Sequence, residues 1–235
     1  MDRSPTYELN VRSGLSPHRR NGVILGAAVG LVGVTFGVLA TTAGLSLPKA
    51  LAMSLLVFTG ASQFAAVGII DAGGSPISAI GSALLLAARN GLYGMRLSEL
   101  FAHLGARRAL AAHFVIDETT ALTVAQDKDD TAREAFWWTG IALFIFWNLG
   151  TAVGVQLGSV IGEPEVWGLD AAFPASFVAL LGPQLATRPG RVAGFVGAAI
   201  ALIAVPFTPA GLPILLAALA VIPAVVVAET GRAGA

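Results

Sequence analysis

The feature that most constrains this chain is a series of long apolar runs, separated by short patches of charged residues. A helix needs about 20 apolar residues to cross the hydrocarbon core of a bilayer, and most of these runs approach that length. We therefore predict an all-α, polytopic membrane protein with about seven apolar segments. The runs fall at about 22–45, 48–70, 76–97, 134–162, 168–186, 190–207 and 210–228.

The composition supports this assignment and excludes several function classes. Only 12% of the residues are charged, against about a quarter in ordinary domains. The formal net charge is zero, so the chain has no basic footprint for nucleic acid. The absence of cysteine excludes thiol catalysis and thiolate metal sites. We find no HExxH, Walker A or dinucleotide motif, so we expect neither an enzyme nor a cofactor nor a metal site.

We predict one domain and a cytoplasmic N-terminus. The tail 1–21 is polar and rich in arginine, the transmembrane domain covers 22–228, and 229–235 forms a short C-terminal tail. Lys and Arg accumulate on the cytoplasmic side of membrane proteins, which places the N-terminal tail there. The run after the tail is too long for the core of a signal peptide, so it is expected to be an uncleaved first span.

The segment 48–70 allows two topologies. If it crosses fully, Arg96, Arg107 and Arg108 lie outside, and 109–126 must cross to bring later arginines back. If it is broken and re-entrant from the outer side, only Lys49 lies outside, provided that 109–126 does not fully cross. The second topology satisfies more positive charges, so we expect at least one broken or re-entrant segment.

The polar residues at 59–63 suit such a break. Irregular backbone at membrane depth is tolerated only where protein or a water-filled cavity covers it. We predict that Thr59, Gly60, Ser62 and Gln63 form part of a substrate site near the middle of the membrane.

The third segment carries a second polar group, made up of Arg89, Asn90 and Tyr93. Arg89 lies about thirteen residues into the segment, too deep to reach water easily, so it requires a carboxylate. That carboxylate can belong to the protein, as a structural salt bridge, or to a substrate. We include all three residues in the predicted substrate site.

Three acidic residues are candidates for proton or charge coupling: Asp117, Glu118 and Asp170. Asp117 and Glu118 are the obvious partners for Arg89, with proton loading as the functional hypothesis. The alternative is an amphipathic helix whose acidic side chains lie in water. Asp170 precedes Pro174 and can be a simple helix cap or part of a second broken helix.

Glycines recur at every fourth position of 134–162, at Gly150, Gly154, Gly158 and Gly162. On a helix they form one ridge that another backbone can approach closely. This ridge can serve helix packing within the chain or the docking of a separate membrane subunit.

Three motifs resemble the AzlC family, the large subunits of branched-chain amino acid exporters. They are VFTGASQFA at 57–65, ARNGLYG at 88–94 and GLDAAFPA at 168–175. The resemblance extends over roughly 20–228 and implies a secondary exporter in the bacterial plasma membrane. It also implies a partner, the small hydrophobic AzlD-type subunit. This chain has Asn90 after Arg89, whereas members of the family often carry a histidine at that position.

The resemblance fits the predicted site. A zwitterionic amino acid needs donors for its carboxylate and acceptors for its ammonium group, and broken helices supply both. We therefore expect export of branched-chain amino acids, driven by a proton gradient. The alternatives are a transporter of another small substrate with the same architecture, or a non-transporting membrane scaffold.

Overall fold

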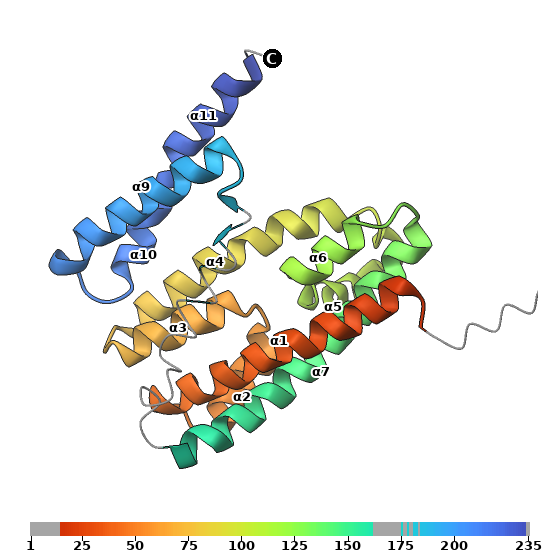
Figure 1. Cartoon of the computed structure of the whole chain (residues 1–235), viewed down its shortest axis with the longest axis horizontal. Coiled ribbons are helices and arrows are strands. Elements are labelled where there is room, and N and C mark those ends of the chain that lie inside the picture. Colours follow the sequence, from red (N-terminus) through yellow and green to blue (C-terminus); the bar gives the residue numbers. More distant parts are fainter. Residues whose placement is uncertain (1–14, 162–174, 176–177, 179–180, 183, 234–235) are drawn as a thin grey trace, which may run out of the picture.

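The computed structural model describes residues 15–161, 175, 178, 181–182 and 184–233, and every element in this part of the chain is helical (Figure 1). Four helical stretches there are long and apolar enough to cross a membrane, which confirms the polytopic helical prediction. They are Pro17–Thr42, Asp129–Val160, Arg188–Phe207 and Leu212–Thr230. The elements are α1 Pro17–Thr42, α2 Leu47–Val57, α3 Ala61–Asp71, α4 Pro76–Leu97, η1 Ala102–Arg107, α5 Arg108–His113, α6 Asp117–Val124, α7 Asp129–Ile161, α9 Arg188–Ala204, η4 Val205–Phe207, α10 Leu212–Ala217, η5 Ala218–Ala220 and α11 Val221–Ala233.

Prolines and serines set several of the helix starts. Proline at the first turn is pre-organised for a helix and lacks the N–H that would have no partner there. α1, α2 and α4 all begin in this way. At the start of α4 the Ser75 hydroxyl also accepts a hydrogen bond from the Ser78 amide at 3.1 Å. The boundaries of α4 therefore agree with the predicted segment 76–97.

α1 and α7 lie side by side and run in the same direction. Gly26 lies against Ala142, where an added Cβ would be 2.9 Å from the Ala142 Cβ. Further along both helices, Gly158 lies against Thr41. The residue numbers of the contacting positions increase together along both helices, so the helices are parallel, as Figure 1 also shows. We call the end where both helices begin end A, and the end where both finish end B.

The segment 48–70 is broken, as predicted. α2 ends just before Phe58, which has a left-handed backbone conformation with φ 39°. Gly60 also has a positive φ of 56°, and α3 begins immediately after it. The Gly60 amide donates a hydrogen bond of 3.1 Å to the Gln63 side-chain oxygen, which caps the new helix.

α2 and α3 also double back on each other. α2 leads from end B toward Phe58, whose ring lies 5.0 Å from that of Phe144. Later in the chain, Phe64 packs on Trp147 at 6.1 Å, and Trp147 is nearer end B than Phe144. Met53 of α2 packs against the cluster that α3 forms with α4. Both ends of the α2–α3 hairpin therefore lie at end B, which is the geometry of a re-entrant element.

A second, shorter hairpin approaches from end A. The stretch 109–126, which crosses the membrane in only one of the two predicted topologies, is not one crossing helix but α5 and α6, joined by residues 114–116. At the tip, the His113 ring stacks on Phe58 with centroids 5.8 Å apart, and Phe114 packs on Phe144 at 5.6 Å. α6 then returns toward the start of α7. The two hairpins thus meet tip to tip inside the molecule.

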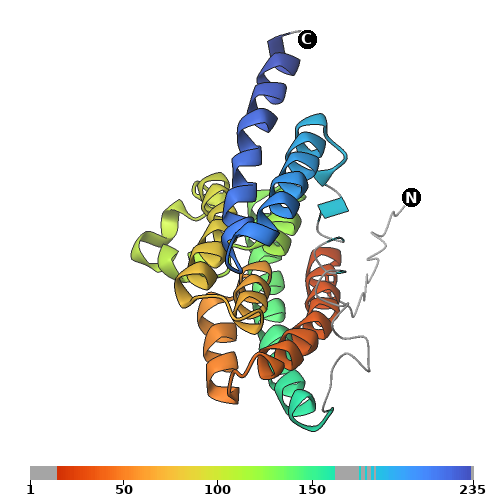
Figure 2. The same ribbon diagram turned by 90° about the vertical axis from the view of Figure 1, so that its left-hand side faces the viewer.

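α4 connects the two ends of the molecule. Ala79, in its first turns, packs with Ala66 and Ile69 of α3 near end B. Beyond its last residue, Phe101 packs on Phe136 at 4.6 Å, near end A. Figure 2 shows that α9 and α11 extend beyond the body formed by the other helices. The loop before α10 contacts that body where Ser82 donates to the Gly211 carbonyl at 3.2 Å.

Candidate functional site

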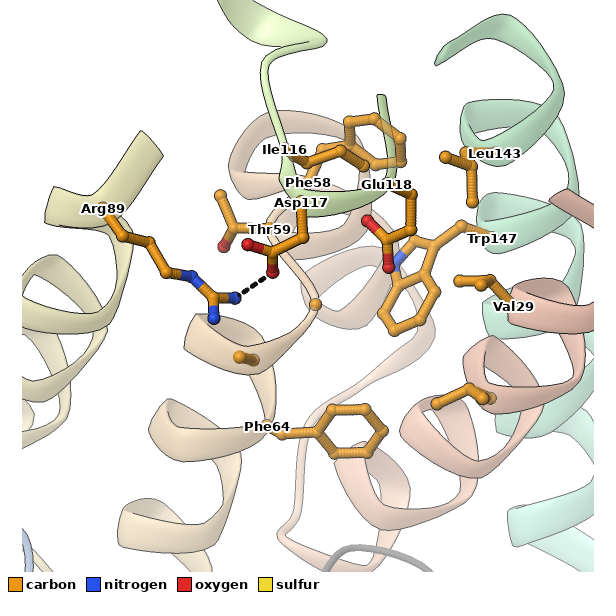
Figure 3. Close-up of a pocket in the computed structure, with 13 residues that line it drawn as sticks. Val29, Phe58, Thr59, Phe64, Arg89, Ile116, Asp117, Glu118, Leu143 and Trp147 are labelled. Atoms are coloured by element: carbon orange, nitrogen blue, oxygen red, sulfur yellow. Dashed lines mark ion pairs between the residues drawn. The ribbon is translucent and has the colours of Figure 1, made fainter. Parts of the chain in front are cut away.

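A cavity of about 260 Å³ lies where the tips of the two hairpins meet (Figure 3). This volume exceeds the roughly 150 Å³ of an apolar cavity that accepts benzene, so a small organic molecule fits. α1, the α2–α3 break, α4, α6 and α7 all contribute to its walls. The lining residues are Val29, Val32, Phe58, Thr59, Gly60, Ala61, Phe64, Arg89, Ile116, Asp117, Glu118, Leu143 and Trp147.

An ion pair between Arg89 and Asp117 forms one side of the cavity. A terminal guanidinium nitrogen of Arg89 lies 2.6 Å from the Asp117 Oδ2 atom, and both side chains remain partly exposed, at 33% and 26%. Figure 3 shows Arg89 reaching from α4 toward Asp117 at the start of α6. Arg89 therefore has the internal carboxylate that its depth requires, and both partners remain accessible from the cavity.

Two helix N-termini point at the same place. α3 begins at the break with Ala61, and α6 begins with Asp117 and Glu118 in its first turn. The N-terminus of a helix carries partial positive charge and free N–H groups, which favour anions. In α6 the chain's own acidic residues already lie against this partial positive charge. At α3 no acidic side chain occupies the first turn, so that N-terminus can accept the anionic group of a ligand.

Several buried polar atoms around the cavity have no hydrogen-bond partner in the described part of the chain. They include Thr59 Oγ1, Arg89 Nε and Trp147 Nε1. An unpaired buried donor costs about 1–3 kcal/mol, so a folded protein rarely keeps several together without a use for them. Two of the three atoms are obligate donors, and this property suits a ligand rich in acceptors such as a carboxylate.

The opposite wall is apolar and closely packed. Figure 3 places Leu143, Trp147 and Val29 across the cavity from Arg89. Trp147 stacks on Phe36 with centroids 5.8 Å apart, and Phe64 meets Phe36 edge-on at 5.6 Å. These contacts fix the shape of the wall. The site therefore combines a charged side with a rigid aliphatic and aromatic side.

Five of the predicted site residues line this cavity: Thr59, Gly60, Arg89, Asp117 and Glu118. Asp117 and Glu118, for which a helix with its acidic side chains in water was the alternative, are both half-buried and line the cavity. They lie beside Arg89 at the tip of the second hairpin. The structure thus gathers one cation and two carboxylates from segments that are distant in sequence.

Ser62 and Gln63 stand behind the cavity wall rather than in it. Both side chains are buried, with 2% and 0% exposure. The Gln63 oxygen caps Gly60, while Gln63 Nε2 has no partner among the described residues. Their roles in substrate binding remain predictions, and the contact that the structure shows for Gln63 is the support of the break.

Asn90 and Tyr93 also lie outside the lining of the cavity. Both are half-buried on α4. Tyr93 packs against the hydrophobic core and neighbours Asp117, so it can position the ion pair from outside. Asn90 has no comparable contact with the described site residues, and its predicted binding role stays a prediction.

The glycine ridge packs against α1. A Cβ on Gly150 would collide with the Gly30 carbonyl oxygen, and one on Gly154 with that of Val34. Gly158 lies against Val38 and Thr41. Helix packing within the chain, the first of the two predicted uses, therefore accounts for these three glycines. Gly162 and Asp170 lie outside the described residues.

The apolar walls of the site were not predicted from the sequence. Trp147 gave one signal, because tryptophan prefers the interfaces of a membrane and this one stands in the middle of a long apolar run. Phe58 and Phe64 flank the polar stretch that was singled out. Val29 and Leu143 carry no distinguishing signal in their own segments. No group of three or more histidine, aspartate or glutamate side chains in the described part of the chain could hold a metal ion.

Comparisons with known proteins agree with this picture. A family model described as "AzlC protein" matches residues 24–161. An uncharacterized membrane protein of Archaeoglobus fulgidus is 35% identical over 179 residues, covering 73% of this chain and 75% of the relative. The inner membrane protein YgaZ of Escherichia coli is 32% identical over 158 residues, 64% of each chain. The branched-chain amino acid transport protein AzlC of Bacillus subtilis is 21% identical over 151 residues, 63% of this chain and 59% of the relative. No solved structure matches.

Proposed function

Because the chain belongs to the AzlC family of membrane proteins, we propose that it is the large subunit of a secondary transporter that exports branched-chain amino acids. The observation that carries the proposal is the two-sided cavity. Its charged side holds Arg89 and Asp117, and its apolar side holds Leu143 and Val29. A branched aliphatic amino acid has the same division, with two charges at one carbon and a compact hydrocarbon at the next.

The proposed transport includes proton coupling and involves no covalent chemistry. Glu118 lines the cavity beside Asp117 and is the candidate to load and release the proton. Acidic side chains at membrane depth are the usual carriers in proton relays. We also propose that the chain works with a small hydrophobic AzlD-type subunit in the bacterial plasma membrane.

The positions of the basic residues support a cytoplasmic end A. Arg20, Arg96, Arg108 and Arg133 belong to the segments that begin or end there, whereas Lys49 belongs to the start of α2 at end B. This distribution follows the positive-inside rule. In this orientation the α5–α6 hairpin lies on the cytoplasmic side of the cavity and the α2–α3 hairpin lies on its outer side.

The test is efflux from cells that have been loaded with a leucine-containing dipeptide. Cells expressing the chain with its small subunit should lose intracellular leucine and isoleucine faster than cells lacking them. Collapse of the proton gradient should abolish the difference. Equal rates of loss with and without the chain would overturn the exporter proposal.

A matched pair of variants links efflux to the cavity. Arg89→Gln removes the cation of the site and leaves Asp117 without its partner, so it should reduce efflux by about tenfold or more, which corresponds to a loss of about 1.4 kcal/mol. Arg96→Gln makes the same change on an exposed residue of the same helix and should leave efflux unchanged. Membrane abundance of both variants is measured alongside. Loss of the Arg89 variant from the membrane would instead favour a structural salt bridge.

A further inference from the structure

The Arg89–Asp117 ion pair joins two elements that otherwise have different neighbours. Arg89 belongs to α4, which packs along α3. Asp117 begins α6, which lies mainly against α7 and meets α4 only briefly. The ion pair is the salt bridge that ties the tip of the second hairpin to α4 in the described part of the chain. It therefore lies both at the binding cavity and at a junction between two elements that pack against different neighbours.

The pair also leaves bonding capacity unused. The Arg89 terminal nitrogen contacts Asp117, but its Nε atom is buried without a partner in the described structure. A guanidinium group matches a carboxylate through two parallel N–H bonds, which this geometry does not complete. A ligand carboxylate that accepted from both nitrogens would hold Arg89 better than Asp117 does.

Such an exchange is favourable only for a ligand that carries both charges. A carboxylate alone would take Arg89 and leave Asp117 unpaired in the cavity, and an amine alone would leave Arg89 unpaired. An uncompensated charge in a partly buried site is destabilising. A zwitterion replaces one ion pair with two and leaves neither Arg89 nor Asp117 without a partner.

We propose that the Arg89–Asp117 ion pair is a latch that only a zwitterionic amino acid opens. The ligand carboxylate displaces Asp117 from Arg89, and its ammonium group binds Asp117. This inference rests on the proposed function and deepens it, because it names the charge requirement and the event that follows binding. With the salt bridge broken, α6 loses its ionic link to α4, and the cytoplasmic hairpin is freer to move.

Binding to the full chain in lipid nanodiscs tests the latch with three probes of one shape. L-Leucine carries both charges, isocaproate carries only the carboxylate, and isoamylamine carries only the ammonium group. In the unaltered chain leucine should bind at least about tenfold more tightly than either of the others. Formate and isoamylamine together reproduce the two charges and the single branched chain of leucine, so they should strengthen each other's binding, because the second ligand pairs the charge that the first one frees.

Two variants give opposite gains that a merely structural salt bridge would not produce. Asp117→Asn frees Arg89, so isocaproate should bind about tenfold more tightly while leucine binds more weakly. Arg89→Gln frees Asp117, so isoamylamine should gain in the same way. Asp130→Asn is the control, because Asp130 pairs with Arg133 at 3.0 Å and is 95% exposed. It should change none of the three affinities.

The outcomes separate the latch from the proposed function. Parallel losses for all probes in both variants, or no mutual effect of the two half-molecules on the unaltered chain, would overturn the latch. The second measurement needs no variant and so holds even if a variant fails to fold. If L-alanine or L-phenylalanine binds with this charge requirement and leucine does not, the latch stands and the branched-chain assignment fails. If no zwitterion binds, both proposals fail.

Discussion

Gly60 has φ 56° and ψ −85°, a combination that side-chain-bearing residues rarely adopt. It turns the chain between α2 and α3, and it also lines the cavity. Space is not the constraint, because an added Cβ would meet its nearest neighbour, Trp147, only at 3.9 Å. The requirement for glycine at this position is therefore one of backbone conformation.

Gly60→Ala should consequently destabilise the chain by about 1–3 kcal/mol, the cost of a strained backbone conformation, and should reduce leucine efflux. Gly91→Ala is the matched control, since Gly91 lies in α4 with nothing within 4 Å of an added Cβ. Alanine is the better helix former there by about 1 kcal/mol, so that variant should be neutral or slightly more stable. Thermal unfolding in detergent measures both variants. Equal stability of the two would refute the conformational explanation.

The break was predictable from single residues, but its geometry was only partly so. Gly60 and the polar side chains around it mark an interruption of an apolar helix. The left-handed Phe58 carries no such mark, because aromatic residues rarely adopt that conformation. Contacts of its ring with Phe144 and His113 hold it there, and those partners come from segments far along the chain.

At the level of elements, α1 and α7 pack through glycines on both helices. Gly30 and Gly37 of α1 face the Gly150–Gly154 stretch of α7 closely enough that an added Cβ on any of them would meet backbone atoms of the other helix. Thr41 adds a hydroxyl contact of 3.5 Å to the Val155 carbonyl. Close backbone approach is what stabilises helix pairs in a bilayer, where burial of apolar surface gives little.

Gly154→Ala should therefore separate the two helices and destabilise the chain by about 1–3 kcal/mol or more. Backbone at Val34 blocks the new methyl group and has no side-chain freedom to move aside. Gly94→Ala, on α4 with open space around it, is the control and should retain the stability of the parent. Denaturant unfolding measures the stability of both variants, and cross-linking between α1 and α7 reports whether the two helices remain in contact. An unaffected Gly154 variant would show that the helices tolerate greater separation.

The spacing of glycines in the sequence predicted a face but not its partner. Gly150 and Gly154 repeat every fourth residue, which marks a ridge suitable for close packing. Gly26 and Gly30 repeat the same spacing in α1. Nothing in either periodicity says which helix meets which, so a separate subunit stayed open as the alternative partner for this ridge. The pairing of this ridge with α1 becomes visible only in the folded molecule.

At the scale of the whole molecule, two hairpins enter from opposite ends and meet at the cavity. The charge pattern favoured this topology for 48–70, and the doubled-back α2–α3 hairpin agrees with it. Arg89 was expected to need a carboxylate, and Asp117 supplies it. The apolar walls could not be foreseen, because Val29 and Leu143 resemble every other aliphatic residue in their spans.

Single cysteines can test this topology directly, since the chain has none of its own. Cysteines replacing Lys49 and Ala72, both exposed residues at the two ends of the α2–α3 hairpin, should react with a membrane-impermeant thiol reagent from the same side. A cysteine replacing the exposed Ala106 should react only from the opposite side. Labelling of intact cells and of inverted vesicles separates the two faces. Opposite accessibility of positions 49 and 72 would mean that the segment crosses the membrane.

The parallel pairing of α1 with α7 also dictates an order of events during synthesis. The surface of α1 around Gly30 and Gly37 is complementary to residues near Gly150 and Thr151, which leave the ribosome much later. Before α7 is synthesised, α1 has no packing partner for this surface. The α2–α3 break likewise lacks Trp147 and Phe144, which cover it in the folded chain. Backbone interrupted at membrane depth is stable only when covered. The α2–α3 hairpin is therefore expected to enter its final position after translation has passed α7, as a late step of membrane integration.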